Sequence, residues 1–159
     1  MNRHTARETA LQMLFQMDIG NNSYEIALNT LEEAAFSKKL MLFTEELVKG
    51  VLQNMAELDV RINSHSRNWQ LDRLSGVDRA ILRLAVYELA YTAETPANVV
   101  INEAIELAKY FSSDEAPAFV NGILDSIWTE LRVQNAKREA DLQNASAEKT
   151  LMQEEKVIE

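Results

Sequence analysis

Residues 75–91, with the sequence SGVDRAILRLAVYELAY, are the stretch that decides the fold. Ser75 followed three residues later by Asp78 is a capping pattern, so we expect a helix to begin here. Beyond Arg83 the stretch is apolar almost all round, which is typical of a helix buried at the centre of a protein. Glu88 is the exception. Because a buried carboxylate needs a partner, we expect an arginine to form a structural ion pair with it.

Apolar residues recur at helical spacing on both sides of this stretch, and no window alternates as a strand would. Breaks are few, because the chain holds only 4 Gly and 2 Pro. The predicted fold class is therefore all-α, with a helical domain at 1–134 and a polar, flexible or partly helical tail at 135–159. The expected helices cover about residues 5–20, 23–34, 37–55 or 37–62, 75–91, 95–111 and 113–131.

Smaller signals refine these helices. Thr5 and Glu8 form a capping box, so the first helix is expected to begin at Thr5, and Ser23 can cap the second helix. Gly50 and Gly122 each lie within an apolar stripe, where glycine costs about 1 kcal/mol relative to alanine. Both glycines therefore indicate close packing against a neighbouring helix.

The composition excludes several classes of protein. The 159 residues include no cysteine, which excludes disulfides, thiolate zinc sites and cysteine nucleophiles. No signal peptide or membrane span is recognisable, so we expect a cytoplasmic protein that does not enter a membrane. The formal net charge of −9 argues against non-specific binding of nucleic acid, although it allows a local basic patch.

The sequence contains no motif typical of an enzyme active site. His4 and His65 are far apart, and neither has a partner at metal-ligand spacing. There is no phosphate-binding loop, no glycine-rich dinucleotide turn and no Gly-x-Ser-x-Gly elbow. We therefore expect a binding protein that has no enzymatic activity, no metal ion and no cofactor.

A small basic segment at the start of the first helix is one candidate binding site. Arg3, His4 and Arg7 surround the first turn, where helix N–H groups also favour anions. These side chains could bind a phosphate backbone, or they could be ordinary surface charges.

By spacing alone Phe15 and Phe119 are core residues, although aromatic side chains can also stack on unpaired bases. Three arginines around the start of the central helix could form ion pairs inside the protein: Arg73, Arg79 and Arg83.

Four long stretches of the sequence resemble the NusB family of bacterial transcription antitermination factors. They are residues 5–15 (TARETALQMLF), 68–74 (NWQLDRL), 77–89 (VDRAILRLAVYEL), and 101–111 (INEAIELAKYF) with 119–125 (FVNGILD). The resemblance covers about residues 3–134. It implies an all-helical fold of two packed three-helix halves. It also implies a protein that binds the boxA RNA of ribosomal RNA leader transcripts together with the ribosomal protein NusE, as part of the RNA polymerase antitermination complex.

The resemblance also implies roles for particular residues. The RNA-contacting positions of the family fall on Arg3, His4, Arg7 and the region from Glu115 to Phe119. Asp78 and Phe15 fall where the family meets NusE. Two departures from the family pattern, a sparser arginine run before the first helix and the Pro117-Ala118 pair, predict weaker RNA binding by this chain alone and a strong dependence on NusE.

Two other interpretations compete with this one. The chain could be a stand-alone RNA-binding module related to that of ribosomal RNA methyltransferases, or a helical protein that associates with itself. The sequence is compatible with either a monomer or a homodimer.

Overall fold

The structure is a computed structural model that describes residues 2–66 and 70–158. Within those residues it contains helices and no strand, which confirms the predicted all-α class. The chain divides into two units, Met1–Ile127 (the helical body) and Trp128–Glu159 (the C-terminal segment), which are described separately. The elements are α1 (Arg3–Asp18), α2 (Tyr24–Glu33), α3 (Lys38–Gln53), α4 (Met55–His65), the 3-10 turn η1 (Leu71–Arg73), α5 (Gly76–Tyr91), α6 (Ala97–Phe111) and α7 (Ala116–Ile158).

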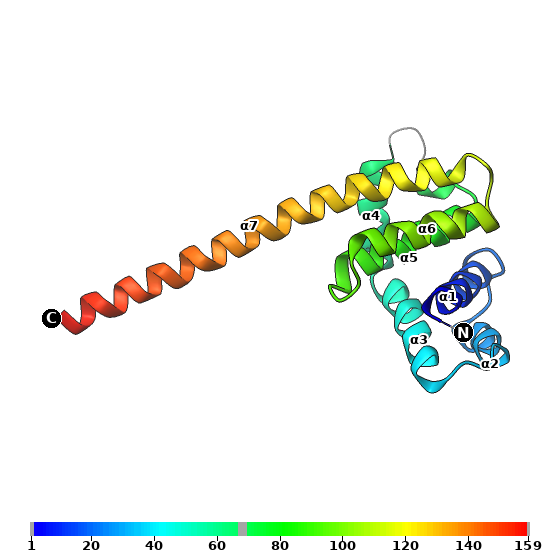
Figure 1. The fold of residues 1–159 in the computed structure, drawn as a ribbon, viewed down its shortest axis with the longest axis horizontal. Coiled ribbons are helices and arrows are strands. Elements are labelled where there is room, and N and C mark those ends of the chain that lie inside the picture. The colour runs from blue at the N-terminus through cyan, green and yellow to red at the C-terminus, as the bar shows by residue number, and fades with distance from the viewer. Residues whose placement is uncertain (1, 67–69, 159) are drawn as a thin grey trace. The chain divides into compact units, whose positions relative to one another are not determined.

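Helix α5 is the central helix of the body, as its apolar composition predicted. It packs against α1, α3, α4 and α6, and Figure 1 shows it running beside α6. Ile81, Leu82 and Val86 are 0% exposed. The predicted cap is also present, because the Asp78 N–H donates to Ser75 Oγ at 3.1 Å. Burying an aliphatic side chain of this size contributes roughly 1.5–3 kcal/mol, so this helix dominates the core.

The two glycines singled out by the sequence behave differently. A Cβ placed on Gly50 would collide with the ring of Tyr87 on α5, so the predicted close approach of α3 to a neighbouring helix is confirmed. A Cβ placed on Gly122 would meet no atom within 4 Å, so the same prediction for α7 is wrong. Both glycines break an apolar stripe in the sequence, but only the structure shows which one has a large ring opposite it.

Two predicted helix boundaries change. Helix α1 begins at Arg3, and Asn2 caps it by accepting the Thr5 N–H at 3.2 Å on its side-chain oxygen, so the predicted start at Thr5 is wrong. Asparagine is as good a cap as threonine, and the extra half-turn places Arg3 and His4 on the helix. The continuous helix over 37–62 is also wrong, because Asn54 leaves the helical conformation and donates from its side chain to the Gly50 carbonyl at 2.8 Å.

The C-terminal segment continues α7 as far as Ile158. Its side chains from residue 132 to residue 157 are all exposed. The predicted boundary between residues 134 and 135 lies inside this helix, while the compact body ends at Ile127. Among the described residues, no helix is both long enough and apolar enough to cross a membrane.

Candidate functional site

A buried ion pair occupies the basic segment at the start of α1. The Arg7 side chain is 4% exposed, and its Nε and Nη2 donate to the two carboxylate oxygens of Glu88, each at 2.9 Å. This confirms the prediction that an arginine pairs with Glu88. The pair joins α1 to the central helix across 81 positions of sequence. While it holds, the guanidinium of Arg7 lies inside the protein.

His4 is bound by carboxylates on both sides of its ring. Its Nε2 lies 3.0 Å from Glu8 Oε1, and its Nδ1 lies 2.5 Å from Glu103 Oε2. The hydrogen bond to Glu103 raises the pKa of His4, and partial burial opposes some of this rise. Glu103 also lies 3.8 Å from Arg7 Nη1, so it links the two basic side chains. With both ring nitrogens engaged, His4 acts as a bridge between α1 and α6.

Arg3 differs from the other two basic residues because its side chain is exposed. Its guanidinium carbon lies 4.6 Å from the centre of the Phe43 ring on α3, and that of Arg7 lies 5.4 Å from the same ring. No carboxylate among the described residues lies within 4.0 Å of Arg3. Of the three basic side chains predicted to bind RNA, Arg3 is therefore the one whose charge remains at the surface.

A hollow of about 280 Å³ brings together residues that the sequence assigned to two different partners. Phe119 of α7 and Glu115, which directly precedes α7, line it with Asp78 in the first turn of the central helix. Asp78 accepts a hydrogen bond from Ser112 Oγ at 2.6 Å, which ties the end of α6 to the same place. Phe119 is half-buried, so it forms part of the wall and is not a core residue. The other lining residues are Arg73, Leu74, Ser75, Ser113 and Ala116.

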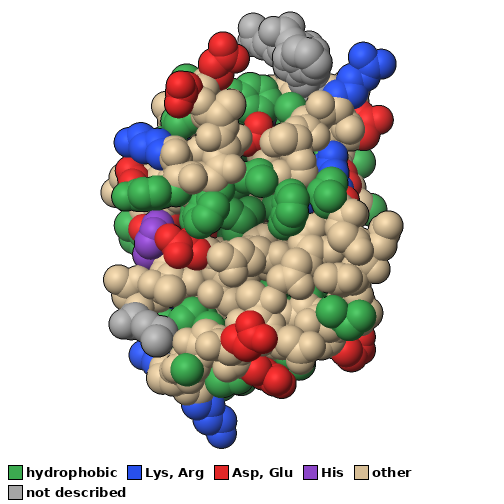
Figure 2. All heavy atoms as spheres, turned by 90° about the vertical axis from the view of Figure 1, so that its right-hand side faces the viewer, with side chains coloured by type: hydrophobic (Ala, Val, Ile, Leu, Met, Phe, Trp, Pro, Cys, Tyr) green, Lys and Arg blue, Asp and Glu red, His purple; other side chains and the backbone are tan. Residues whose placement is uncertain are grey.

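An apolar face, here called the docking face, lies next to this hollow. Phe15 and Ile19 at the end of α1 are 37% and 51% exposed. Both lie against Gly76 at the start of α5, where a Cβ would be 3.1 Å from Phe15 Cε2 and closer still to Ile19. Phe111, which ends α6, is 41% exposed and precedes the serine bonded to Asp78. Figure 2 shows hydrophobic side chains gathered in a band across one face of the molecule.

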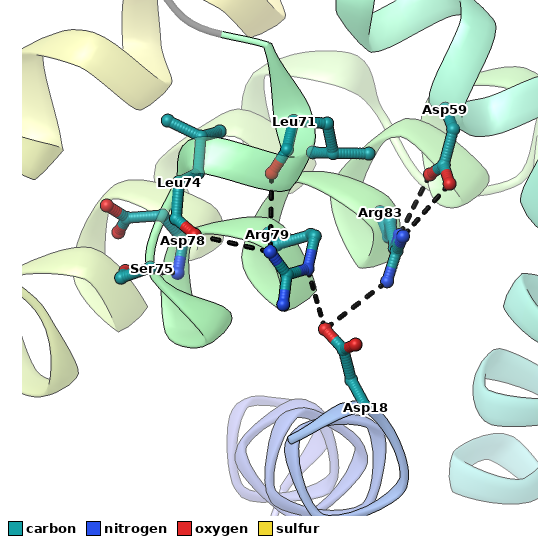
Figure 3. A network of polar contacts seen from close by, with 8 residues as sticks. All are labelled: Asp18, Asp59, Leu71, Leu74, Ser75, Asp78, Arg79 and Arg83. Atoms are coloured by element: carbon teal, nitrogen blue, oxygen red, sulfur yellow. Dashed lines mark hydrogen bonds and ion pairs between the residues drawn. The ribbon is translucent and has the colours of Figure 1, made fainter.

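A network of ion pairs fixes the end of α1, the helix end that also carries Phe15 and Ile19 of the docking face (Figure 3). Asp18 Oδ2 accepts from Arg79 Nε at 2.7 Å and from Arg83 Nη1 at 3.5 Å. Arg83 also makes a two-pronged contact with Asp59 of α4, at 2.8 and 2.9 Å. This confirms Arg79 and Arg83 as intramolecular ion-pair formers. Arg73, the third arginine of that group, lines the hollow instead.

Arg79 further stabilises the turn that leads into α5. Its Nη1 donates to the carbonyl oxygens of Leu71 and Leu74, at 3.4 and 3.2 Å (Figure 3). These two residues lie in or next to η1, just before the capping serine of α5. One arginine thus joins the end of α1, which carries Phe15 and Ile19 of the docking face, to the η1 turn and the start of the central helix.

The remaining polar groups of the described residues form no cluster that could hold a metal ion. His65 Nδ1 lies 2.7 Å from Ser126 Oγ, which joins α4 to α7. Across residues 2–66 and 70–158, no group of three or more metal-binding side chains comes together. The described functional groups therefore define an all-helical protein that presents its candidate sites on its surface: an arginine on an aromatic ring, a hollow with an aromatic wall, and an apolar face.

Comparisons with known proteins identify the family. The NusB family profile matches residues 4–129. The transcription antitermination protein NusB of Bacillus velezensis is 52% identical over 132 residues, which are 82% of this chain and 98% of that protein. The Bacillus subtilis protein of the same name is also 52% identical, with the same coverage. The chain therefore belongs to the NusB family.

Solved structures agree with this assignment. The T. maritima NusB structure matches with a TM-score of 0.77 and 35% identity, over 82% of this chain and 92% of that chain. A structure of the antitermination factors NusB and NusE in complex with double-stranded RNA matches with a TM-score of 0.74 and 29% identity, over 82% and 99% of the two chains. The family match ends at residue 129, so most of the C-terminal segment lies outside it.

Sequence reasoning missed the residues that neutralise the basic segment. Glu8 was interpreted as part of a capping box, and no contact with the basic segment was predicted for Glu103 or Phe43. The useful signal was the spacing of His4 and Glu8, which are four residues apart and therefore neighbours on a helix. The contacts of Glu103 and Phe43 join different helices, and no local pattern marks them.

Proposed function

We propose that this chain is a transcription antitermination protein that binds boxA RNA together with NusE and promotes read-through by RNA polymerase. The observation that carries this proposal is the likeness to the NusB of the NusB–NusE–RNA structure, of which the chain covers 99%. The name of the Bacillus relatives supports the same function. We propose a binding role without catalysis, in the cytoplasm, where bacterial transcription takes place.

We propose that NusE binds the docking face, through Phe15 and Asp78. Partly exposed aromatic side chains at a surface are frequent anchors of protein interfaces. Asp78 gives the face a fixed negative charge at its edge, oriented by the hydrogen bond from Ser112. An apolar anchor with a charge at its edge matches the apolar core and polar rim of protein interfaces.

We propose that RNA contacts Arg3 and the hollow that contains Phe119 and Glu115. The exposed guanidinium of Arg3 can bind a phosphate, and the Phe119 ring can stack on an unpaired base. His4 and Arg7 support this interface indirectly, because their carboxylate partners hold α1 in place. Of the three basic side chains at the start of α1, His4 and Arg7 are engaged by carboxylates, which supports the expectation that RNA binding depends strongly on NusE.

The test is a binding assay with a boxA RNA oligonucleotide and a scrambled control, with and without NusE, at one fixed salt concentration. The proposal expects sequence-dependent binding that becomes tighter when NusE is present. Weakening of NusE binding by Phe15→Ala, and of RNA binding by Phe119→Ala, would support the assignment of the two surfaces. If boxA and scrambled RNA bind equally even with NusE, the proposed function is wrong.

A further inference from the structure

The ring of Phe43 has an unusual position, because two arginines of another helix lie over it. The guanidinium carbons of Arg3 and Arg7 are 4.6 and 5.4 Å from its centre. Both distances are within the range in which an aromatic ring attracts a cation. Phe43 is half-buried in α3, which packs along α1. It therefore connects the start of α1 to a second helix.

The two arginines on this ring are not equivalent. Arg7 is neutralised by Glu88 and is 3% exposed, so its contact with Phe43 belongs to the core. Arg3 is exposed and has no carboxylate within 4.0 Å among the described residues, so its contact with the ring is what orients it. A guanidinium carries five N–H donors, and a single aromatic face cannot engage all of them. Donors of Arg3 therefore remain available to an anion.

Holding Arg3 in this way favours binding of a phosphate. A free arginine side chain loses conformational entropy when it grips a ligand, and that loss weakens binding. The Phe43 ring removes part of the loss before the ligand arrives. Lys39 lies one helical turn before Phe43, on the same side of α3, and is exposed. A second cation is therefore present on the same helix face as the ring.

We propose that Phe43 is a positioning residue that holds Arg3 for contact with an RNA phosphate, and that Lys39 extends the RNA-binding surface from α1 onto α3. This inference rests on the proposed RNA-binding function. It adds two residues of α3 to a surface that the sequence confined to the starts of α1 and α7. Phe43 acts through Arg3, while Lys39 contacts a neighbouring phosphate directly.

The experiment measures binding of the full chain, with NusE, to a boxA RNA oligonucleotide over a series of salt concentrations. Phe43→Leu keeps an apolar side chain of similar size but removes the aromatic face. We expect it to weaken RNA binding about two- to fivefold, the range expected for loss of an exposed cation–π contact. Phe43→Tyr keeps the face and should restore the affinity. If Phe43 only fills space, the Phe43→Leu variant will bind RNA as tightly as the wild type, and the proposal is wrong.

A double-substitution cycle separates positioning from packing. In the Arg3→Ala background, Phe43→Leu should cause no further loss, because the side chain that it positions is already absent. An equal loss in both backgrounds would overturn the proposal. Arg3→Ala should also reduce the slope of log affinity against log salt by about 0.7, the value for one phosphate contact of a single strand. Thermal unfolding of each variant shows whether the fold is retained.

The role of Lys39 has a matched control in Lys49, an exposed lysine on the same helix that lies 5.5 Å from the Tyr24 ring. Lys39→Ala and Lys49→Ala change the net charge equally, but only Lys39→Ala should reduce the salt slope. Equal effects of the two substitutions on the salt slope would overturn the extension of the RNA surface onto α3.

If the wild type does not distinguish boxA from scrambled RNA, the proposed function itself fails. Specific binding that is insensitive to Phe43→Leu would refute this inference alone.

Discussion

The two ends of α1 use their side chains in opposite ways. At its start, charged side chains form ion pairs within the protein: Arg7 is buried against Glu88, and His4 bridges Glu8 and Glu103. At its end, apolar residues remain uncovered: Phe15 and Ile19 are 37% and 51% exposed. The simple expectation that charges face solvent and apolar side chains face the core fails at both ends. Such reversals are informative, because a buried charge or an exposed apolar group has a free-energy cost that some other role must offset.

The largest effect is expected from Glu88→Gln, which removes the carboxylate hydrogen-bonded to the buried Arg7 and leaves only Glu103, at 3.8 Å, as a counter-charge. We expect a loss of roughly 3–5 kcal/mol in the free energy of unfolding, measured by urea denaturation. The double variant Arg7→Met with Glu88→Leu serves as the control, since an apolar pair of similar volume should be much less destabilising than either unpaired charge. A loss below about 1 kcal/mol for Glu88→Gln would show that the pair does not hold α1 in place.

At the end of α1, a substitution should weaken binding of the partner more than it lowers the stability of the fold. Phe15→Ala should change the free energy of unfolding by less than about 1 kcal/mol, because the side chain is partly exposed. It should weaken binding of NusE by about 2 kcal/mol or more, roughly thirtyfold, as expected for an aromatic anchor. Calorimetric titration measures this affinity. Val60→Ala on α4, where the valine is 67% exposed, is the control and should leave NusE binding unchanged.

An intermediate effect is expected from Asp18→Asn, which weakens the ion-pair network at the end of α1. Asp18 accepts from both Arg79 and Arg83, and its side chain is 27% exposed. We expect a loss of about 1–2 kcal/mol in the free energy of unfolding, since a part-buried charged hydrogen bond is removed. Glu33→Gln removes the same charge at an exposed position of α2 and should change stability by less than about 0.5 kcal/mol. Equal effects of the two substitutions would contradict a structural role for the network.

The smallest effect should be the pH dependence contributed by His4. Its pKa is raised in the folded protein above the ordinary value of about 6.5, mainly by the hydrogen bond to Glu103. The folded state therefore binds the proton more tightly than the unfolded state. The resulting stability is fully present below about pH 6.5 and is lost as the pH rises through the folded-state pKa.

His4→Gln should remove this dependence, which we expect to be below about 1 kcal/mol because the ring is partly exposed. The measurement is the free energy of unfolding at a series of pH values from 5 to 9 for both proteins. If the free energies of unfolding of the two proteins differ by the same amount at every pH, the charge of His4 does not contribute to stability.

The sequence predicted the central helix well, because its signals are local. Ser75 caps α5 as expected, and the apolar run after it is buried. The same reasoning predicted that Glu88 needs an arginine, but it could not choose Arg7, which lies 81 positions away. Which arginine pairs with Glu88 depends on how the helices pack, and no short window of sequence predicts that packing.

The candidate site was predicted less completely for the same reason. The resemblance to the family implied RNA contacts for Arg3, His4 and Arg7, but two carboxylates that neutralise this segment come from α5 and α6. The hollow shared by Phe119 and Asp78 was equally unpredictable from sequence, since residues at the starts of α5 and α7, far apart in the chain, line it together. Resemblance to a family supplied these positions, and the structure supplied what surrounds them.

The long exposed part of α7 has a consequence for how the protein melts. Because side chains 132–157 are all exposed, this stretch takes no stability from a hydrophobic core and depends on the weak cooperativity of an isolated helix. Its backbone amides should exchange with heavy water far faster than those of α5. On heating, its circular dichroism signal should decline gradually from low temperature, as a sloping baseline that precedes the sharp transition of the helical body.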